Sequence, residues 1–527
     1  MICRTVWIVL LATSFVGSVR AQDAASLPRG HVFYQSDFEK SDALKGWSGS
    51  AGRLVPEGTN QVVLIEQTPS NSQAFAMMQL PLPVEQLRGY VVEFSARVKA
   101  EAISKKPNPW NGVKFMVPWT RQDGSKDWPA VEFESGSFDW RTVAFRVSVP
   151  DDARDVQLAL GLEQVSGKVW YDDVRVTVYR SLRRTPRPVA TGPVFKGHSL
   201  KRLRGAMISP NLSEEDLRVL GQEWNANLIR WQLIRTGRFA DSLDLKAYDE
   251  WLKGELAKLD RMLPACEKYG LRVALDLHSP PGGKSTSGGY AGSDNGLFTD
   301  AACQDRFVTL WQEIARKYKD NPVIWGYDLA NEPVEAVTTP GLLDWQELAE
   351  KTAKAIREID AERAIIVEPA SWGSPDGLLA LEPLDVPNVI YSVHMYIPHE
   401  FTHQNVHNET SPKVYPGEMG GRKWDKAELQ KALQPAIDFQ KKYNVHIYIG
   451  EFSAIRWAPD NSAYRYLRDV IEICEAHDWD WSYHAFREWD GWSVEHGADR
   501  QNRQRATTPT DRETLLRSWY QQNEKPR

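Results

Sequence analysis

From Leu203 onward the chain repeats one pattern, in which a short apolar run is followed by a longer segment with helical spacing of its apolar residues. Eight runs have the length and composition of buried parallel strands. They occupy residues 203–208, 227–231, 272–278, 323–332, 364–368, 389–396, 446–451 and 479–484. The helical segments include 245–269, 301–318, 344–359, 426–443 and 463–476. Eight strand–helix units over about 320 residues match the count and size of a (β/α)8 TIM barrel.

A doubly wound open sheet is the rival α/β fold for such a repeat. It would need a glycine-rich turn of the G-x-G-x-x-G type after its first strand. No such turn follows Ile208. We therefore predict a barrel over residues 198–522.

Polar side chains gather at the C-terminal ends of the predicted strands. The fourth run ends in Asn331 and Glu332, and the next residue, Pro333, cannot donate a strand hydrogen bond. Other runs carry Arg230, Asp276, His278, His394, Tyr396 and Glu451 at or near their ends. Because all strand ends on one face of a barrel open into a single pocket, the sequence predicts a polar site with two glutamates.

Two short motifs resemble glycoside hydrolase family 5, the cellulase family of the retaining (β/α)8 clan A. Asn331-Glu332-Pro333 is similar to the family's N-E-P motif, and Gly450-Glu451-Phe452 is similar to its G-E-F/W motif. The resemblance covers roughly residues 200–500. It implies that Glu332 is the acid/base and that Glu451 is the nucleophile.

The resemblance also implies a substrate-binding set around the two glutamates: Arg230, His278, Asn331, His394 and Tyr396. We expect Arg230 and Tyr396 to keep Glu451 ionised, and Asn331 to bind the sugar 2-hydroxyl. The two histidines are expected to shape the subsite and tune the acid.

The end of the eighth strand departs from the family pattern. The family usually has a tryptophan there as a sugar platform, whereas His484 falls on that position in this sequence. We expect Trp489 or Trp492, in the following loop, to supply the platform.

Two carboxyl groups about 5–5.5 Å apart allow a double displacement with retention of configuration. One carboxylate attacks the anomeric carbon while the other group protonates the leaving oxygen. We expect Glu332 to start protonated because of the nearby charge on Glu451.

The segment from 30 to 180 has period-two alternation in short runs, which predicts an all-β sandwich. Predicted strands are 90–98, 113–119, 130–134, 142–149, 156–162 and 169–179. Residues 138–141 and 167–176 resemble jelly-roll carbohydrate-binding modules. We expect weak polysaccharide binding through exposed aromatic residues such as Trp110, Trp119 and Trp128. A spacer domain without a ligand is the alternative.

Residues 1–21 have an apolar run, Val6–Val16, followed by small residues, which predicts a secretory signal peptide and a secreted or periplasmic protein. No later apolar stretch reaches about 18 residues, so we expect no membrane span. Residues 181–197 hold three prolines and three arginines and are predicted to be a linker.

The net charge of −6, with basic residues spread among acidic ones, argues against a nucleic-acid partner. Three cysteines remain after signal cleavage, Cys266, Cys303 and Cys474, and we expect them to be buried thiols. We expect a monomer with no cofactor and no metal.

The predicted function is a retaining glycoside hydrolase that cuts a β-linked polysaccharide internally, like an endo-β-1,4-glucanase. Alternatives on the same fold are action on mannan, exo-β-glucosidase action and transglycosylation. A non-catalytic carbohydrate-binding protein would lack one of the glutamates. A metal-dependent barrel hydrolase would need a His-x-His on the first strand, and Arg230 would repel a cation.

Overall fold

The computed structural model describes residues 27–526 except 29, 72–73, 122–123, 150–151, 182–188, 236–242, 284–295, 336–340 and 407–410. The predicted signal peptide and residues 182–188 of the predicted linker lie outside the described residues. None of the described helices combines the length and apolarity that crossing a membrane requires.

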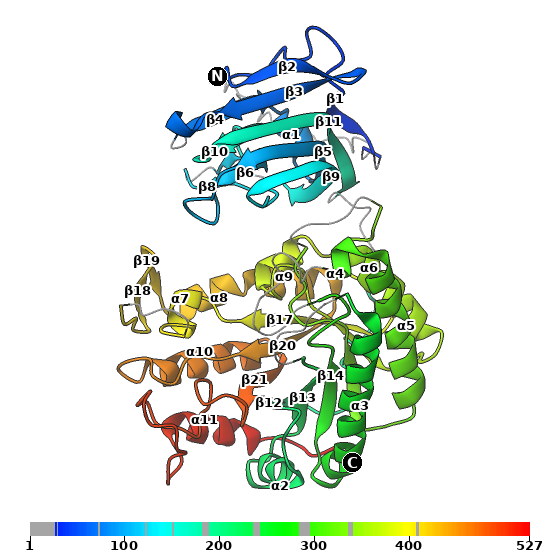
Figure 1. The fold of residues 1–527 in the computed structure, drawn as a ribbon. Helices are drawn as coiled ribbons and strands as arrows, with labels where there is room; N and C mark the ends of the chain where they lie inside the picture. Colours follow the sequence, from blue (N-terminus) through cyan, green and yellow to red (C-terminus); the bar gives the residue numbers. More distant parts are fainter. Residues whose placement is uncertain are drawn as a thin grey trace, which may run out of the picture.

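The C-terminal part of the chain is a closed barrel of eight parallel strands, which confirms the predicted (β/α)8 fold (Figure 1). Each predicted run overlaps one of these strands, and neighbouring strands follow one another in sequence order. The strands are β12 (Arg204–Ile208), β13 (Leu228–Gln232), β14 (Arg272–Asp276), β15 (Ile324–Asp328), β16 (Ala364–Val367), β17 (Val389–Met395), β20 (His446–Phe452) and β21 (Asp480–Phe486).

Helices alternate with the strands and cover the outside of the barrel (Figure 1). The longer ones are α3 (Leu245–Lys268), α5 (Ala301–Tyr318), α6 (Trp345–Arg357), α9 (Gln434–Tyr443), α10 (Ser462–Ala476) and α11 (Asp511–Tyr520). Shorter ones are α2 (Glu214–Arg218), a π-helical turn η2 (Val219–Glu223), α4 (Gly296–Thr299), η4 (Pro375–Leu379), α7 (His399–Thr402) and α8 (Lys426–Ala432). A small ribbon, β18 (Gly417–Met419) and β19 (Arg422–Trp424), precedes α8.

One predicted helix is divided. The helical pattern of 426–443 forms α8 and α9, which meet at Leu433. Proline has no N–H and is most readily accommodated in the first turn of a helix. Pro435 therefore begins a new helix instead of lying inside a continuous one.

Strand alternation explains how the barrel places polar groups above an apolar interior. An interior cluster contains Leu228, Ala274, Ile366 and Ile390 together with Leu203, Trp325, Ala364 and Tyr448. Side chains two positions further along a strand point the same way. The same face therefore carries Arg230, Asp276, Glu368, Ser392 and His394 at its upper end. The alternation of side chains along the strands thus places both the apolar interior cluster and the polar site above it on the same face.

The N-terminal part is a sandwich of two antiparallel sheets (Figure 1). The larger has the order β2-β3-β11-β5-β9, with β1 also paired to β11, and the smaller has the order β4-β10-β6. Bounds of the larger sheet are β1 (Val32–Ser36), β2 (Gly52–Glu57), β3 (Asn60–Gln67), β5 (Tyr90–Ile103), β9 (Gly136–Ser148) and β11 (Gly167–Ser181). Those of the smaller are β4 (Phe75–Pro81), β6 (Gly112–Met116) and β10 (Gln157–Glu163).

The sandwich differs from the sequence prediction at two places. Residues 130–134 do not form a strand, since only Ala130 makes an isolated bridge, to Met116. Strands β1 to β4 were not predicted. The pair β7 (Trp119–Thr120) and β8 (Lys126–Asp127), the short helix α1 (Val84–Leu87) and the turn η1 (Pro69–Asn71) complete the described elements.

The sandwich is fastened to the barrel at the start of α6. The Tyr179 hydroxyl, near the end of β11, donates to Glu347 Oε2 at 2.6 Å and accepts from the Asp344 N–H at 3.2 Å. The Arg146 guanidinium lies 3.3 Å from the centre of the Tyr179 ring and donates to the Leu342 carbonyl at 3.3 Å. Asp344 is also the N-cap of α6. The sandwich therefore contacts the segment that leads from β15 into α6.

The three cysteines outside the signal segment, Cys266, Cys303 and Cys474, are buried thiols that form no disulfide, as predicted.

Candidate active site

Arg230 lies at the centre of the polar site, fully buried on β13. Its guanidinium contacts four carboxylates from other strands of the barrel. The distances are 2.5 Å from Nη1 to Glu451 Oε1, 2.8 Å from Nη2 to Glu368 Oε1, 2.9 Å from Nε to Asp328 Oδ2 and 3.1 Å from Nη2 to Asp276 Oδ1. One cation thus joins the ends of β14, β15, β16 and β20.

Burial acts against ionisation of two of the four carboxyl groups. It raises the pKa of Asp276 to about 8, against the attraction of Arg230. It also raises the pKa of Asp328 well above its ordinary range. Both aspartates are therefore harder to ionise than an exposed carboxyl group, even beside the guanidinium.

Glu451 is held as an anion by several donors. Its Oε2 accepts a hydrogen bond from the Tyr396 hydroxyl at 2.9 Å and lies 3.1 Å from His484 Nδ1. Burial alone would raise the pKa of Glu451, but the positive charges of His394, His484 and Arg230 lower it well below its usual range. Burial and the Glu451 charge raise the pKa of Tyr396, which keeps its hydroxyl protonated as a donor.

Gly450, which precedes Glu451, lies so close to the side chains of β17 that a larger residue would not fit there. A Cβ at Gly450 would lie 2.6 Å from Ser392 Oγ and 3.0 Å from His394 Nε2. The pairing of β17 with β20 also shifts register at this point, so that His394 pairs with Glu451. The shift brings the Glu451 side chain into the pocket beside His394.

Glu332 lies four residues beyond the end of β15, in the loop and not on the strand itself. Its backbone has a φ of 44°, which is strained for a residue with a side chain. The conformation is held by its own N–H, which donates to Glu368 Oε2 at 2.7 Å. The Glu332 side chain remains 15% exposed, whereas that of Glu451 is 4% exposed. Glu332 is therefore the more accessible of the two carboxyl groups.

His394 bridges three carboxylates. Its Nδ1 lies 2.9 Å from Glu332 Oε1 and 3.7 Å from Glu451 Oε2, and its Nε2 lies 3.1 Å from Glu368 Oε1. Burial by itself lowers the pKa of His394, but Glu368, Glu451 and the bond to Glu332 raise it well above its ordinary value. One oxygen of Glu332, one of Glu451 and a nitrogen of His394 all lie within 4.8 Å of one another.

His278 and Asn331 complete the site on the opposite side of Arg230. His278 Nδ1 lies 2.8 Å from Asp276 Oδ2, and its Nε2 lies 3.2 Å from Asn331 Nδ2. Asn331 Oδ1 accepts from Arg230 Nη2 at 3.2 Å. The structure thus brings together all seven residues that the sequence singled out: Arg230, His278, Asn331, Glu332, His394, Tyr396 and Glu451.

Glu368 is a member of the site that the sequence reasoning did not name. It is fully buried and contacts Arg230, His394 and the Glu332 backbone. A signal was present, because Glu368 is the last residue of the fifth predicted strand run. Gly373 packs against it so closely that a Cβ there would lie 2.7 Å from Glu368 Oε2.

Aromatic side chains line the edge of the site that follows β21. Trp492 is 7% exposed, and its ring centre lies 5.8 Å from that of Tyr396 and 5.9 Å from that of His484. Trp489 packs edge-on against Trp492 at 5.5 Å and is 37% exposed. Of the two tryptophans expected as the platform, Trp489 has the more accessible surface.

A second exposed tryptophan lies near Glu332. Trp372 follows β16 and is 45% exposed. Its backbone N–H donates to the Pro333 carbonyl at 3.4 Å. Its position beside the Asn331-Glu332-Pro333 segment was not predicted from the sequence.

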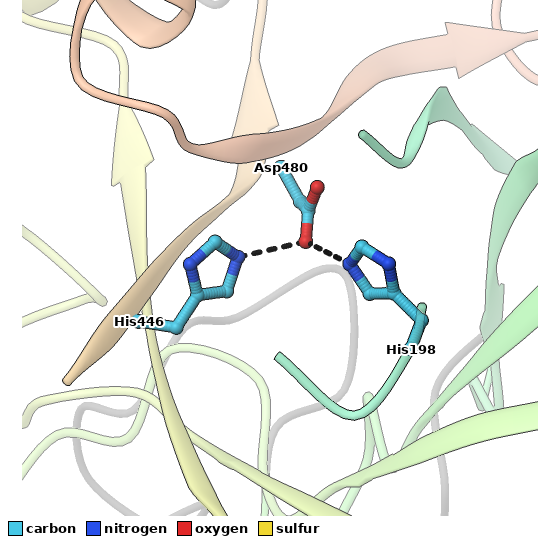
Figure 2. A group of neighbouring side chains, drawn as sticks. All are labelled: His198, His446 and Asp480. Atoms are coloured by element: carbon cyan, nitrogen blue, oxygen red, sulfur yellow. Dashed lines mark hydrogen bonds and ion pairs between the residues drawn. The ribbon is translucent and has the colours of Figure 1, made fainter. Parts of the chain in front are cut away.

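A different cluster of ionisable residues lies at the N-terminal ends of β20 and β21 (Figure 2). His446 Nε2 and His198 Nε2 lie 2.7 Å and 2.8 Å from the same oxygen of Asp480, Oδ2. Ligands bound tetrahedrally to a zinc ion at about 2.0–2.1 Å would be about 3.4 Å apart. The observed separations are those of hydrogen bonds, and the cluster ties the segment before β12 to two barrel strands.

The chain is similar in sequence to known cellulases. The family model described as "Cellulase (glycosyl hydrolase family 5)" matches residues 190–490. Endoglucanase C of Acetivibrio thermocellus is 32% identical over 257 residues, which are 44% of this chain and 72% of that protein. Cellodextrinase A of Ruminococcus flavefaciens is 27% identical over 226 residues, 42% of this chain and 64% of that protein. The structure of endoglucanase Cel5A from Thermotoga maritima is 26% identical, with a TM-score of 0.45 over 59% of this chain and 96% of that one.

Proposed function

Because the chain belongs to the cellulase family, glycosyl hydrolase family 5, we propose that it cleaves internal bonds of a β-1,4-linked glucan. In this proposal Glu451 is the nucleophile and Glu332 is the acid/base. The chain is a retaining glycoside hydrolase. The observation that carries the assignment of roles is the contrast between two neighbouring carboxyl groups. Glu451 is buried and held ionised by cations, whereas Glu332 is partly exposed and contacts His394.

In the first step, a Glu451 oxygen forms a bond to the anomeric carbon as the glycosidic C–O bond breaks. Glu332 gives its proton to the leaving oxygen, which departs as an alcohol. In the second step, Glu332 takes a proton from water, and the water oxygen displaces Glu451 from the anomeric carbon. Both residues return to their starting protonation states, and two inversions give net retention.

The surrounding residues have distinct positioning tasks. Arg230, Tyr396 and His484 fix the Glu451 carboxylate and lower its pKa, so that it is ionised before substrate arrives. Asn331 is placed to bind the sugar 2-hydroxyl, a contact that strengthens in the transition state. His278 shapes the subsite, and Trp489 offers an aromatic face to a sugar ring.

Glu368 positions the acid/base. Its Oε1 lies beside His394 Nε2, which leaves Nδ1 of the same ring directed to Glu332. Its Oε2 accepts the Glu332 N–H and holds that residue in its strained conformation. Glu368 and His394 therefore fix the position of the Glu332 carboxyl group, while its proton goes to the leaving oxygen and returns from water.

A panel of soluble polysaccharides with products resolved by chain length tests the substrate. We expect β-1,4-glucan and mixed-linkage glucan to give intermediate oligosaccharides early in the reaction. Release of glucose alone would indicate exo action, preference for mannan would change the sugar, and longer products than substrates would show transglycosylation.

Leaving-group chemistry tests the roles of the glutamates. Glu332→Ala should retain activity on an activated aryl glycoside, which needs no proton, and added azide should yield a β-glycosyl azide. Glu451→Ala should lose activity on every substrate. Equal losses for Glu332→Ala on good and poor leaving groups would contradict the assignment.

We also propose that residues 1–21 direct export as a signal peptide, which is then cleaved after Ala21. Secretion into the periplasm or medium with Gln22 as the first residue would be detected by N-terminal sequencing of the recovered protein, and a retained Met1 would contradict export.

A further inference from the structure

The outward face of the sheet β4-β10-β6 contains a hollow of about 900 Å³. Along β4, Phe75, Met77 and Gln79 line this hollow, while Met78 and Leu80 alternate with them into the sandwich core. The volume lies within the range of about 300–1,000 Å³ typical of sites for small ligands. We call this hollow and its lining the aromatic cleft.

Exposed aromatic side chains surround the cleft. Trp110 is 66% exposed, Phe75 63% and Trp128 61%. In the described part of the chain, the other exposed tryptophans are Trp372 and Trp489, both beside the active site. Large aromatic groups left in water forgo the free energy of burial, so their grouping at a concave surface indicates a ligand with apolar faces.

The backbone of the loop that carries Trp110 is held by hydrogen bonds to neighbouring side chains. Lys114 donates from Nζ to the Trp110 carbonyl and pairs with Glu163 at 2.5 Å. Asn111 is 2% exposed, and its Oδ1 accepts from the Asn108 N–H at 3.1 Å. The backbone on either side of the exposed indole is therefore held in place, which reduces the entropy lost on binding.

The segment that carries Trp128 is fixed in a similar way. Asp127 accepts from Trp119 Nε1 and from Arg121 Nε, both at 2.7 Å. On the other side, the Pro129 carbonyl accepts from the Val117 N–H at 2.8 Å. Trp119 itself is only 5% exposed, so the expectation that it is a surface aromatic is wrong. Its ring packs in the core and its N–H supports the loop.

Charges in the cleft lining balance. Two cations, Lys106 and Lys114, face two anions, Glu132 and Glu163. A charged ligand gains little there, whereas a neutral ligand with flat apolar faces and hydroxyl edges fits the exposed rings and the polar groups between them. Pyranose rings in a β-linked chain have this chemistry.

We propose that the aromatic cleft binds a neutral β-linked polysaccharide chain, with Trp110 and Trp128 as the sugar-stacking residues. The choice of a glycan as the ligand rests on the proposed function of the barrel, whereas the site itself rests on the sandwich alone. The cleft is a second binding site, separate from the catalytic pocket.

The test uses the full chain with Glu451→Gln, so that the polymer is bound and not cut. Retardation in gels containing soluble β-glucan or glucomannan would be compared for Trp110→Ala, Trp128→Ala and the double variant. Trp140→Ala is the matched control, because Trp140 lies on β9 of the other sheet. We expect each single substitution to weaken the affinity for the glycan about tenfold, as the loss of a tryptophan hot spot does. The double variant should show no retardation, whereas the Trp140→Ala control should be retarded like the parent.

Two results would overturn the proposal. One is a double variant retained as strongly as the control; the other is retention on a phenyl matrix with none on any glycan, which would indicate an apolar partner. Circular dichroism of each variant separates lost binding from lost folding.

The outcome is independent of catalysis. With Glu451 intact, the double variant should hydrolyse a short soluble aryl glycoside at the unaltered rate. Tryptophan-dependent retention without hydrolysis of any glucan would refute the proposed function and leave the cleft in place, whereas hydrolysis without such retention would refute the cleft alone.

Discussion

The two ends of strands β20 and β21 carry the same kinds of side chain with different outcomes. At the N-terminal ends, His446 and Asp480 join His198, and at the C-terminal ends, Glu451 and His484 join His394. In both places a buried carboxylate has its pKa lowered by neighbouring histidines, against the effect of burial.

The difference lies in whether an accessible carboxyl group stands beside the buried carboxylate. Asp480 Oδ2 lies at hydrogen-bond distance from both imidazoles and its Oδ1 accepts the Leu203 N–H, so a completely buried group is saturated. At the other end, Glu332 stays partly exposed and only 2.9 Å from His394. A low pKa therefore does not by itself mark a catalytic carboxylate; an accessible partner beside it does.

The largest effect is expected at the C-terminal end. Glu451→Gln keeps the shape of the side chain but removes the nucleophile, and activity on polysaccharide should fall by on the order of 10⁴-fold or more. The measurement is kcat/KM for purified protein, with the melting temperature as a check on folding. Activity above about one hundredth of the parent value would place the nucleophile elsewhere.

The N-terminal cluster should respond in the opposite way. Asp480→Asn removes the charge shared by two imidazoles, and we expect a loss of about 3 kcal/mol in the free energy of unfolding with activity per folded molecule unchanged. Denaturant unfolding and active-site titration measure the two quantities. A selective loss of activity would show that the two ends are coupled.

The pH dependence of stability sharpens this second test. Because the pKa of Asp480 is lower in the folded protein than its value of about 3.9 in the unfolded chain, its contribution is present above that pH and is lost as the pH falls further. The Asp480→Asn protein should lack this part of the acid destabilisation.

Glu368→Gln should have an intermediate effect. Its charge helps to raise the pKa of His394, so its removal should lower that pKa and move the alkaline limb of the rate profile to lower pH. The contact with Glu332 also weakens, and we expect about a 30-fold lower kcat, equal to about 2 kcal/mol. A stability loss with an unshifted profile would make Glu368 structural only.

His484→Gln should give the smallest change. The pKa of His484 is raised to about 10 because Glu451 and Glu488 outweigh burial, so it is cationic over most of the working range. Its removal raises the pKa of Glu451, and the acidic limb of kcat/KM should move up by about one pH unit. An unchanged acidic limb would leave Arg230 and His394 as sufficient partners.

Much of the barrel could be predicted because its signals are local. The eight apolar runs and the motif ends at Glu332 and Glu451 depend only on neighbouring residues, and strand parity predicts which side chains share the pocket. The same parity points to Glu368. It was missed because a single carboxylate at a strand end is common, and because the contacts that identify it, with residues of β13 and β17, appear only in the folded protein.

Other features depend on tertiary contacts that no short pattern contains. The sharing of Arg230 among four carboxyl groups, and the raised pKa values of Asp276 and Asp328, follow from burial in one small volume. Trp119 lies in a turn-rich segment yet is buried, because its N–H reaches Asp127 across the β7–β8 pair. The first four sandwich strands have weak alternation and are fixed by pairing: β1 and β3 pair with β11, β4 pairs with β10, and β2 pairs with β3.

The contact of Tyr179 with Asp344 and Glu347 has a consequence for the proposed glycan site. Two hydrogen bonds and a stacked guanidinium fix how the sandwich meets the barrel at this point. A glycan bound in the aromatic cleft, as proposed, would then be held at a fixed place relative to the barrel. Since a polysaccharide has distinct reducing and non-reducing ends, such a fixed arrangement would let the two ends meet the catalytic pocket differently.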